Sequence, residues 1–176
     1  MATDLSSTTV PYASAEDLLL VYDYRLVGQT FTTDNTQADE AEIAASDVVA
    51  NALLSASGDV EAKVMVGGMY SVDMLTTIGL PSNPADITAT GKRLKRIVCG
   101  LAFWRLWLFR HPMDSPDKFP GVVEALADLD AIAEGEAIFG SPPAIDAGLP
   151  ETTPWVNPVD YSRHVLEASR FFPGVR

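Results

Sequence analysis

The sequence predicts an all-α fold, a small helical bundle of about four core helices with extended N- and C-terminal arms. Apolar residues recur at helical spacing through residues 92–110 and also occupy the other side of this segment, which is typical of a buried central helix. Helical periodicity also runs through residues 38–66 and 121–134. No stretch of the chain shows a convincing strand pattern, so helices alone define the fold class.

The length and composition indicate one domain with appendages. Hydrophobic residues make up 47% of the 176 residues and charged residues 20%, which is a globular composition. We expect an N-terminal arm at residues 1–11, a helical domain at 12–140, and a proline-rich C-terminal arm at 141–176 with a short terminal helix. Cys99 is the only cysteine, so no intramolecular disulfide forms, as is usual in a reducing cytosol.

The charge is strongly acidic but unevenly placed. The formal net charge is -12, yet residues 91–120 hold seven bases against Asp114 and Asp117. An acidic chain is a poor candidate for wrapping nucleic acid, because duplex binding is largely phosphate neutralisation. The basic block is instead suited to an acidic surface on another copy of the chain, which hints at self-assembly. A solvated basic patch is an equally good interpretation.

The N-terminal half predicts two helices. Ser14 can cap the first helix, with Asp17 completing a capping box, and Gly28 ends it. The second spans residues 38–66 and contains Gly58, which marks a close helix contact or a kink. Residues 69–89 form a connection whose apolar side chains should partly pack on the domain.

The central helix is expected to begin near residues 86–90 and to end at His111. Its first turns carry four bases that oppose the helix dipole, which indicates that these bases have partners elsewhere. After a proline-containing hinge, residues 121–134 should pack antiparallel to it, with Gly135 at the C-terminal cap. The bases are Lys92, Arg93, Lys95 and Arg96.

The C-terminal arm carries aromatic residues that need a surface. Residues 140–158 are rich in proline and contain Trp155, and a last helix is expected over about 159–171. We expect Trp155, Phe171 and Phe172 to dock on another subunit or on a neighbouring protein.

No pattern in the sequence indicates catalysis, a cofactor or a metal. There is no nucleophile motif or phosphate-binding loop, and His111 and His164 lack convincing partners. Cys99 is best read as a small buried hydrophobic residue. Residues 97–109 are too short an apolar run to span a membrane, and Arg105 interrupts them. We therefore expect a non-enzymatic protein without cofactors.

The order of these segments resembles the head–tail connector adaptor (head completion, or neck) family of tailed phages, including neck proteins of Mu-like prophages. The first helix opens like the family's Tyr-x-Thr/Ser-x-Glu-Asp-Leu start. An alanine-rich helix, a basic-then-aromatic helix and a last amphipathic helix follow. The segments are YASAEDL (12–18), VVANALLSAS (48–57), LKRIVCGLAFWRL (94–106), and ALADL (125–129) with IAEG (132–135).

This resemblance implies a structural virion protein at the phage neck, assembled in the host cytoplasm. Such a protein forms a ring, commonly of twelve copies, under the portal protein. It extends the channel for genomic DNA, without sequence-specific binding, and is the platform for the next neck or tail protein. Candidate contacts with other subunits or the portal are Lys92, Arg93, Lys95, Arg96, Trp155, Phe171 and Phe172.

Two alternatives stay open at this stage. One is a small helical DNA-binding module, like a terminase small subunit or a helix-turn-helix protein, that reads DNA with residues 92–96. The net charge of -12 argues against it. The other is an enzyme or a bacterial helical domain unrelated to phages, for which the sequence names no site.

Overall fold

The computed structural model describes residues 10–31 and 38–140, and within them it contains helices and no strand. All these residues belong to one unit, Met1–Pro142. The all-α prediction is confirmed. The elements are α1 (Ala15–Val21), α2 (Tyr24–Phe31), α3 (Glu40–Ala44), α4 (Asp47–Gly67), α5 (Val72–Gly79), the 3-10 turn η1 (Pro84–Asp86), α6 (Ala89–Arg110), the 3-10 turn η2 (Pro116–Lys118) and α7 (Pro120–Ala133).

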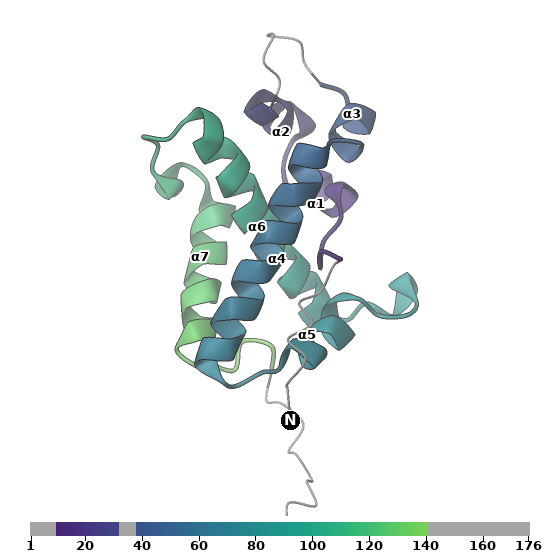
Figure 1. Cartoon of the computed structure of the whole chain (residues 1–176), viewed down its shortest axis with the longest axis vertical. Helices are drawn as coiled ribbons and strands as arrows, with labels where there is room; N and C mark the ends of the chain where they lie inside the picture. The colour runs from purple at the N-terminus through teal and green to yellow at the C-terminus, as the bar shows by residue number, and fades with distance from the viewer. Residues whose placement is uncertain (1–9, 32–37, 141–176) are drawn as a thin grey trace, which may run out of the picture. The chain divides into compact units, whose positions relative to one another are not determined.

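The long helix α6 is the centre of this unit. It packs against α1, α2, α4, α5 and α7, and Figure 1 shows α4 crossing in front of it with α7 alongside. Its buried residues lie on several sides of the helix, from Gly91 to Leu106, as expected for a central helix. Phe103 is fully buried and contacts the rings of Trp107 and Phe119. The predicted central helix is confirmed.

The predicted helix over residues 14–28 is divided in two. The capping box at Ser14 and Asp17 is present, but α1 ends at Tyr22, whose backbone is extended. The Tyr22 ring stacks on Phe103 with centroids 4.1 Å apart, and the Asp23 carboxylate accepts a hydrogen bond from the Arg25 amide. Aromatic packing and this local cap therefore turn the chain, and the predicted helix end, Gly28, lies inside α2.

The predicted helix over residues 38–66 is also divided, into α3 and α4. Asp39 and Glu42 form a capping box for α3, and the chain bends at Ser46, whose extended backbone starts α4. Gly68 ends α4 in the left-handed conformation, as expected for a helix C-terminus. Gly58 marks no close helix contact, because a Cβ atom there would meet nothing within 4 Å.

The connection over residues 69–89 packs on the domain as expected but contains a helix that was not predicted, whereas the last helix agrees with its prediction. The connection after α4 contains the short helix α5, and Leu75 within it is fully buried. α7 returns alongside α6 in the opposite direction (Figure 1), and Gly135 follows it with a positive φ of 79°. Gly100 permits this close packing, because a Cβ atom there would lie 2.6 Å from the Ala125 methyl group.

Candidate functional site

The basic turn of α6, defined as Lys92, Arg93, Lys95 and Arg96, is held by acids from the neighbouring helices. Arg93 forms a bidentate contact with Asp128 of α7, with nitrogen–oxygen distances of 2.7 and 3.3 Å. Its Nη1 also donates to the backbone carbonyl of Ile138 at 3.0 Å. Arg93 therefore ties α6 to α7 and to the chain that follows α7.

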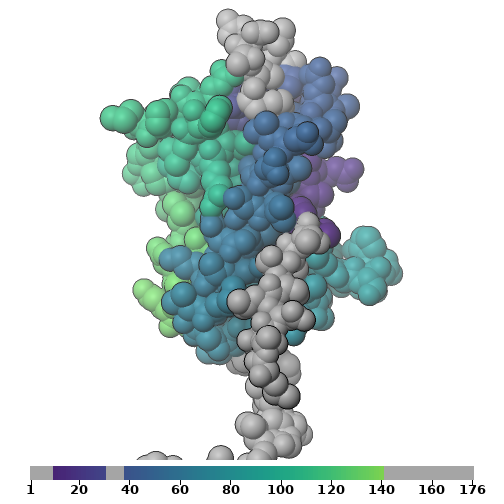
Figure 2. Space-filling model, viewed as in Figure 1, coloured from purple at the N-terminus to yellow at the C-terminus, as the bar shows by residue number. Residues whose placement is uncertain are grey.

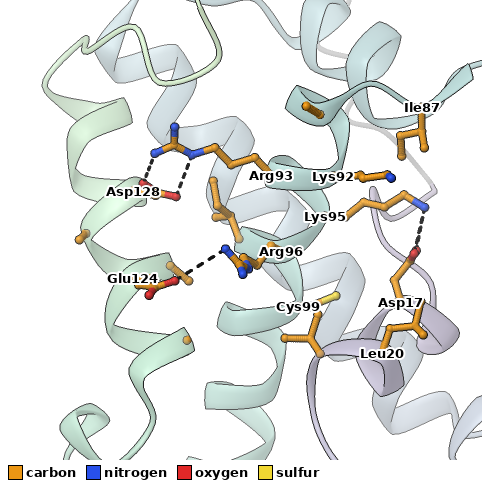
Figure 3. Close-up of a pocket in the computed structure, with 16 residues that line it drawn as sticks. Asp17, Leu20, Ile87, Lys92, Arg93, Lys95, Arg96, Cys99, Glu124 and Asp128 are labelled. Atoms are coloured by element: carbon orange, nitrogen blue, oxygen red, sulfur yellow. Dashed lines mark hydrogen bonds and ion pairs between the residues drawn. The ribbon is translucent and has the colours of Figure 1, made fainter.

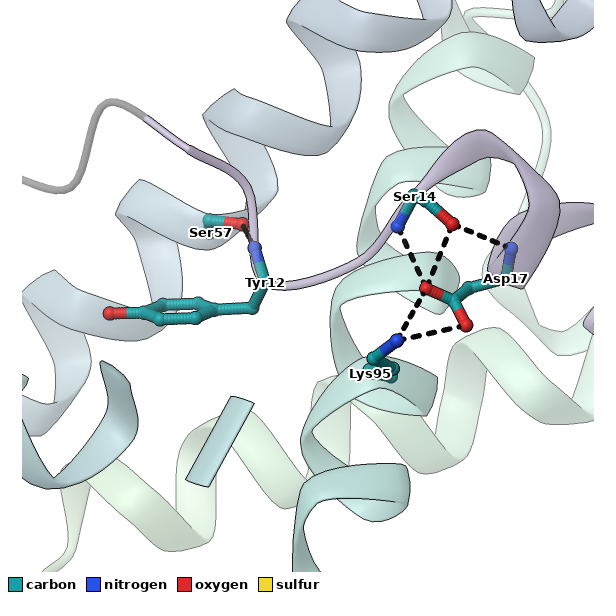
Figure 4. A network of polar contacts seen from close by, with 5 residues as sticks. All are labelled: Tyr12, Ser14, Asp17, Ser57 and Lys95. Atoms are coloured by element: carbon teal, nitrogen blue, oxygen red, sulfur yellow. Dashed lines mark hydrogen bonds and ion pairs between the residues drawn. The ribbon is translucent and has the colours of Figure 1, made fainter. Parts of the chain in front are cut away.

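Lys95 makes the corresponding contact with α1 (Figure 4). Its Nζ lies 2.9 and 3.1 Å from the Asp17 carboxylate oxygens, and the same carboxylate accepts hydrogen bonds from the Ser14 amide and hydroxyl. Burial alone would raise the pKa of Asp17, but the contacts with Lys95 and Ser14 outweigh it, so the pKa lies below 3.8. The cap of α1 is thereby fastened to α6.

The other two bases of the turn are less constrained. Arg96 lies 3.9 Å from Glu124 of α7, and both side chains are about two-thirds exposed. Lys92 is exposed, and the structure shows no ion pair for it with any described residue. Three of the four bases thus have acidic partners, as the unfavourable helix dipole suggested, and those partners lie within the same chain.

These residues surround a groove of about 890 Å³. α6 forms its floor, and α1 and α7 form its two walls (Figure 3). The lining is mostly apolar, with Val21 and Leu20 on the α1 side and the small residues Gly121 and Ala127 on the α7 side. Leu20 is 85% exposed. We refer to this feature as the α1–α7 groove.

A second surface follows the outer side of α4, which faces the viewer in Figure 2. Positions three or four residues apart on this side are exposed and uncharged, and Val66, Met65 and Leu54 are 75%, 56% and 37% exposed. Asp59 at the edge of this side is paired with Arg105. We call it the α4 ridge, and define it as Asn51, Leu54, Ser55, Gly58, Ala62, Met65, Val66 and Met69.

A third exposed apolar feature lies where α6 ends. Phe109 is 84% exposed and Met113 is 95% exposed. Beside them, Trp107 donates its indole N–H to Asp114 at 2.9 Å and stacks on His111. This end of the domain is therefore ordered by polar contacts but still presents two large apolar side chains to solvent.

Burial raises the pKa of the Cys99 thiol to about 12, so it is not a ready nucleophile at neutral pH. Within residues 10–31 and 38–140, no group of three or more His, Cys, Asp or Glu side chains is placed to hold a metal ion. Among the same residues, no helix is long and apolar enough to cross a membrane.

The sequence prediction covered only part of these surfaces. Its four basic residues lie together at the α1–α7 groove, whereas Trp155, Phe171 and Phe172 lie outside the described residues. It did not identify the α4 ridge. The sequence does contain a signal for the α4 ridge, because none of its positions from Asn51 to Met69 is a charged residue.

Comparison with known proteins gives no relative for this chain. No family model, no curated protein and no solved structure matches it.

Proposed function

We propose that this chain is a structural virion protein, a head–tail connector adaptor of a tailed phage. In this role it forms a ring, of about twelve copies as in the family that it resembles, under the portal protein. It extends the DNA channel and offers a platform to the next neck or tail protein. The order of its capped, alanine-rich, basic-aromatic and amphipathic segments supports this assignment, and the all-α fold is consistent with it.

The observation that carries the proposal is the pairing of three of the four bases of the basic turn with acids of the same chain. A DNA-binding module places its lysines and arginines on phosphates, and each contact releases a counterion. Here Asp17 and Asp128 already hold Lys95 and Arg93 in close contacts. Phosphates would have to displace these carboxylates within a chain of net charge -12. The alternative of a small DNA-binding module is therefore disfavoured.

The exposed apolar side chains support contacts with other proteins. Leu20 at the α1–α7 groove and Val66 on the α4 ridge are each at least three-quarters exposed. Apolar residues scattered singly are ordinary on a surface, but contiguous patches mark sites of protein association. The α4 ridge and the α1–α7 groove are two such patches on one small unit. An adaptor needs several surfaces of this kind, because it contacts its own copies, the portal and the next protein.

The acidic charge also suits a channel component. The chain has 24 acids against 12 bases, and most of the bases of the described residues are engaged in ion pairs with its own acids. A wall with few free cations lets DNA slide past, because it offers the phosphates little counter-charge.

The test is the mass of the purified protein in solution, first alone and then with the portal protein from the same source. We expect the 18.9-kDa chain to join the portal as a ring of many copies. In parallel, retention on duplex DNA at moderate salt should be negligible. A protein that ignores the portal and binds duplex DNA would overturn the proposal in favour of the DNA-binding module.

A further inference from the structure

We propose that the ring is held together by the α4 ridge of each copy lying in the α1–α7 groove of the next. This inference rests on the proposed ring-forming function and names the two surfaces that would meet. The partner is thus a second copy of the same chain, and each copy contributes a different surface to each of its two neighbours.

The first argument is the composition of the α4 ridge. Its positions span almost the whole of α4, are exposed, and contain no charged residue. A solvent-facing helix side normally carries charged and polar residues opposite its core side. Leu54, Met65 and Val66 instead offer apolar area, and Gly58 and Ala62 between them allow close approach of another surface. This side of α4 is therefore suited to contact with protein.

The second argument is the shape of the α1–α7 groove. A helix about 10 Å in diameter occupies on the order of 400 Å³ per turn, so a groove of about 890 Å³ accommodates roughly two turns. The α7 wall contains the small residues Gly121 and Ala127 between the paired acids Glu124 and Asp128, and Leu20 and Val21 supply an apolar wall opposite. The groove therefore has the volume for a partly inserted helix, and the larger part of its exposed lining is apolar.

The third argument is charge complementarity. No lysine or arginine occurs between Arg25 and Lys63, so α3 and most of α4 carry acids alone. The exposed acids beside the start of the ridge include Glu40 and Asp47. The groove supplies Lys92, which has no ion pair among the described residues, and Arg96, whose pairing at 3.9 Å is loose. These two bases are available to a neighbour's acids.

The fourth argument is the placement of the two surfaces. Arg105 of α6 contacts Ser55 and Asp59 of α4. The groove residues Lys92 and Arg96 project from the opposite side of α6, roughly 180° around the helix axis from Arg105. The ridge and the groove are thus on opposite sides of the unit. A contact between two different surfaces is heterologous, and repeating it produces a closed ring or an open filament, not a two-fold dimer.

The test uses one charge-inserting variant on each surface and one control. Leu20→Glu places a charge in the groove, Met65→Glu places one on the ridge, and Met113→Glu places one at an exposed apolar residue outside both surfaces. Circular dichroism checks that all three remain helical. With portal present, we expect the ring mass to be lost for Leu20→Glu and Met65→Glu and kept for Met113→Glu.

Mixing the two defective variants tests the heterologous geometry directly. The Leu20→Glu copy has an unaltered α4 ridge, and the Met65→Glu copy has an unaltered α1–α7 groove. The mixture should therefore yield a one-to-one dimer of about 38 kDa, twice the 18.9 kDa of one chain, and nothing larger. Two monomers that stay apart in the mixture, under conditions where wild-type copies associate, would overturn the pairing of these two surfaces.

Cysteine cross-linking can detect the interface even if the copies associate too weakly for a mass measurement. Because Cys99 is fully buried, cysteines introduced by Leu20→Cys in one copy and Met65→Cys in another would be the reactive thiols among the described residues. We expect their disulfide dimer to form several-fold more than the dimer of Met113→Cys with Met65→Cys. Equal yields, or rings that survive both glutamate variants, would refute the interface but leave the proposed function standing. No association with the portal by the wild-type chain would instead refute the proposed function.

Discussion

Two glycines of α4 should respond in opposite ways to the same substitution. A Cβ atom at Gly67 would lie 1.9 Å from the carbonyl oxygen of Ile132 and 3.3 Å from the amide nitrogen of Gly135, both in the backbone at the end of α7. A Cβ atom at Gly58 would meet nothing within 4 Å. We therefore expect Gly67→Ala to destabilise the domain and Gly58→Ala to stabilise it.

The magnitudes follow from helix propensity and packing. Alanine is favoured over glycine in a helix interior by about 1 kcal/mol, which Gly58→Ala should gain in full. At Gly67 the ends of α4 and α7 must separate by more than about 1 Å to relieve the contact. Overpacking costs roughly 1–3 kcal/mol, and more where a backbone atom is struck, so we expect a net loss of about 2 kcal/mol. The two variants should then differ by about 3 kcal/mol.

Urea unfolding at low protein concentration, where copies are apart, measures this difference. With a slope of about 2 kcal/mol per molar urea, the midpoints should lie about 1.5 M apart with unchanged slopes. Equal midpoints would show that α4 and α7 do not meet at Gly67. A Gly58→Ala variant less stable than wild type would show that this side of α4 is already covered in the monomer.

Three further predictions concern side chains of α1, α6 and the turn between α1 and α2. The Tyr22 hydroxyl is buried without a hydrogen-bond partner among the described residues, so Tyr22→Phe should raise stability by up to about 1 kcal/mol; a clear loss in urea unfolding would contradict this. The pKa of Asp17 is lowered in the folded state, so its carboxylate stabilises the fold above the ordinary value of 3.8, and this contribution is lost as the pH falls through the lower folded value. Asp17→Asn should accordingly lower the free energy of unfolding by about 1 kcal/mol at pH 7 and leave it unchanged in strong acid. A loss of stability that persists in acid would show that the Asp17 charge is not what stabilises the fold. Because burial raises the pKa of Cys99 from 9.0 to about 12, a disulfide reagent at pH 8 should react with it about a thousandfold more slowly in native than in unfolded protein; fast native labelling would show that the thiol is accessible.

The sequence predicted α6 and α7 well because their signals are local. α6 and α7 begin and end near the expected residues, since periodicity, His111 and Gly135 are read within a few residues of the chain. The break after α1 has no such signal. Neither Tyr22 nor Asp23 is a helix breaker of the kind that glycine or proline is, and the chain turns there because the Tyr22 ring stacks on Phe103, about eighty residues further on.

The candidate site shows the same limit. Four bases in the first turns of α6 indicated missing partners, but the sequence has 24 acids and does not say which of them approach. Packing brings Asp17 and Asp128 to Lys95 and Arg93, because α1 and α7 flank α6. A charge pattern therefore predicts the need for compensation, whereas only the fold shows that most of the compensation is internal and that Lys92 remains available.

The central place of α6 also sets an order for folding during synthesis. α1, α2 and α4 all pack against α6, yet they precede it in the chain, so α4 lacks its main packing partner until α6 has been made. At roughly 5–20 residues per second, the ribosome needs several seconds to pass from α1 to the end of α6. During that interval α4 is apolar on both its core side and its ridge. The nascent chain is therefore most prone to premature association before α6 emerges, and that hazard falls once α6 covers the core side.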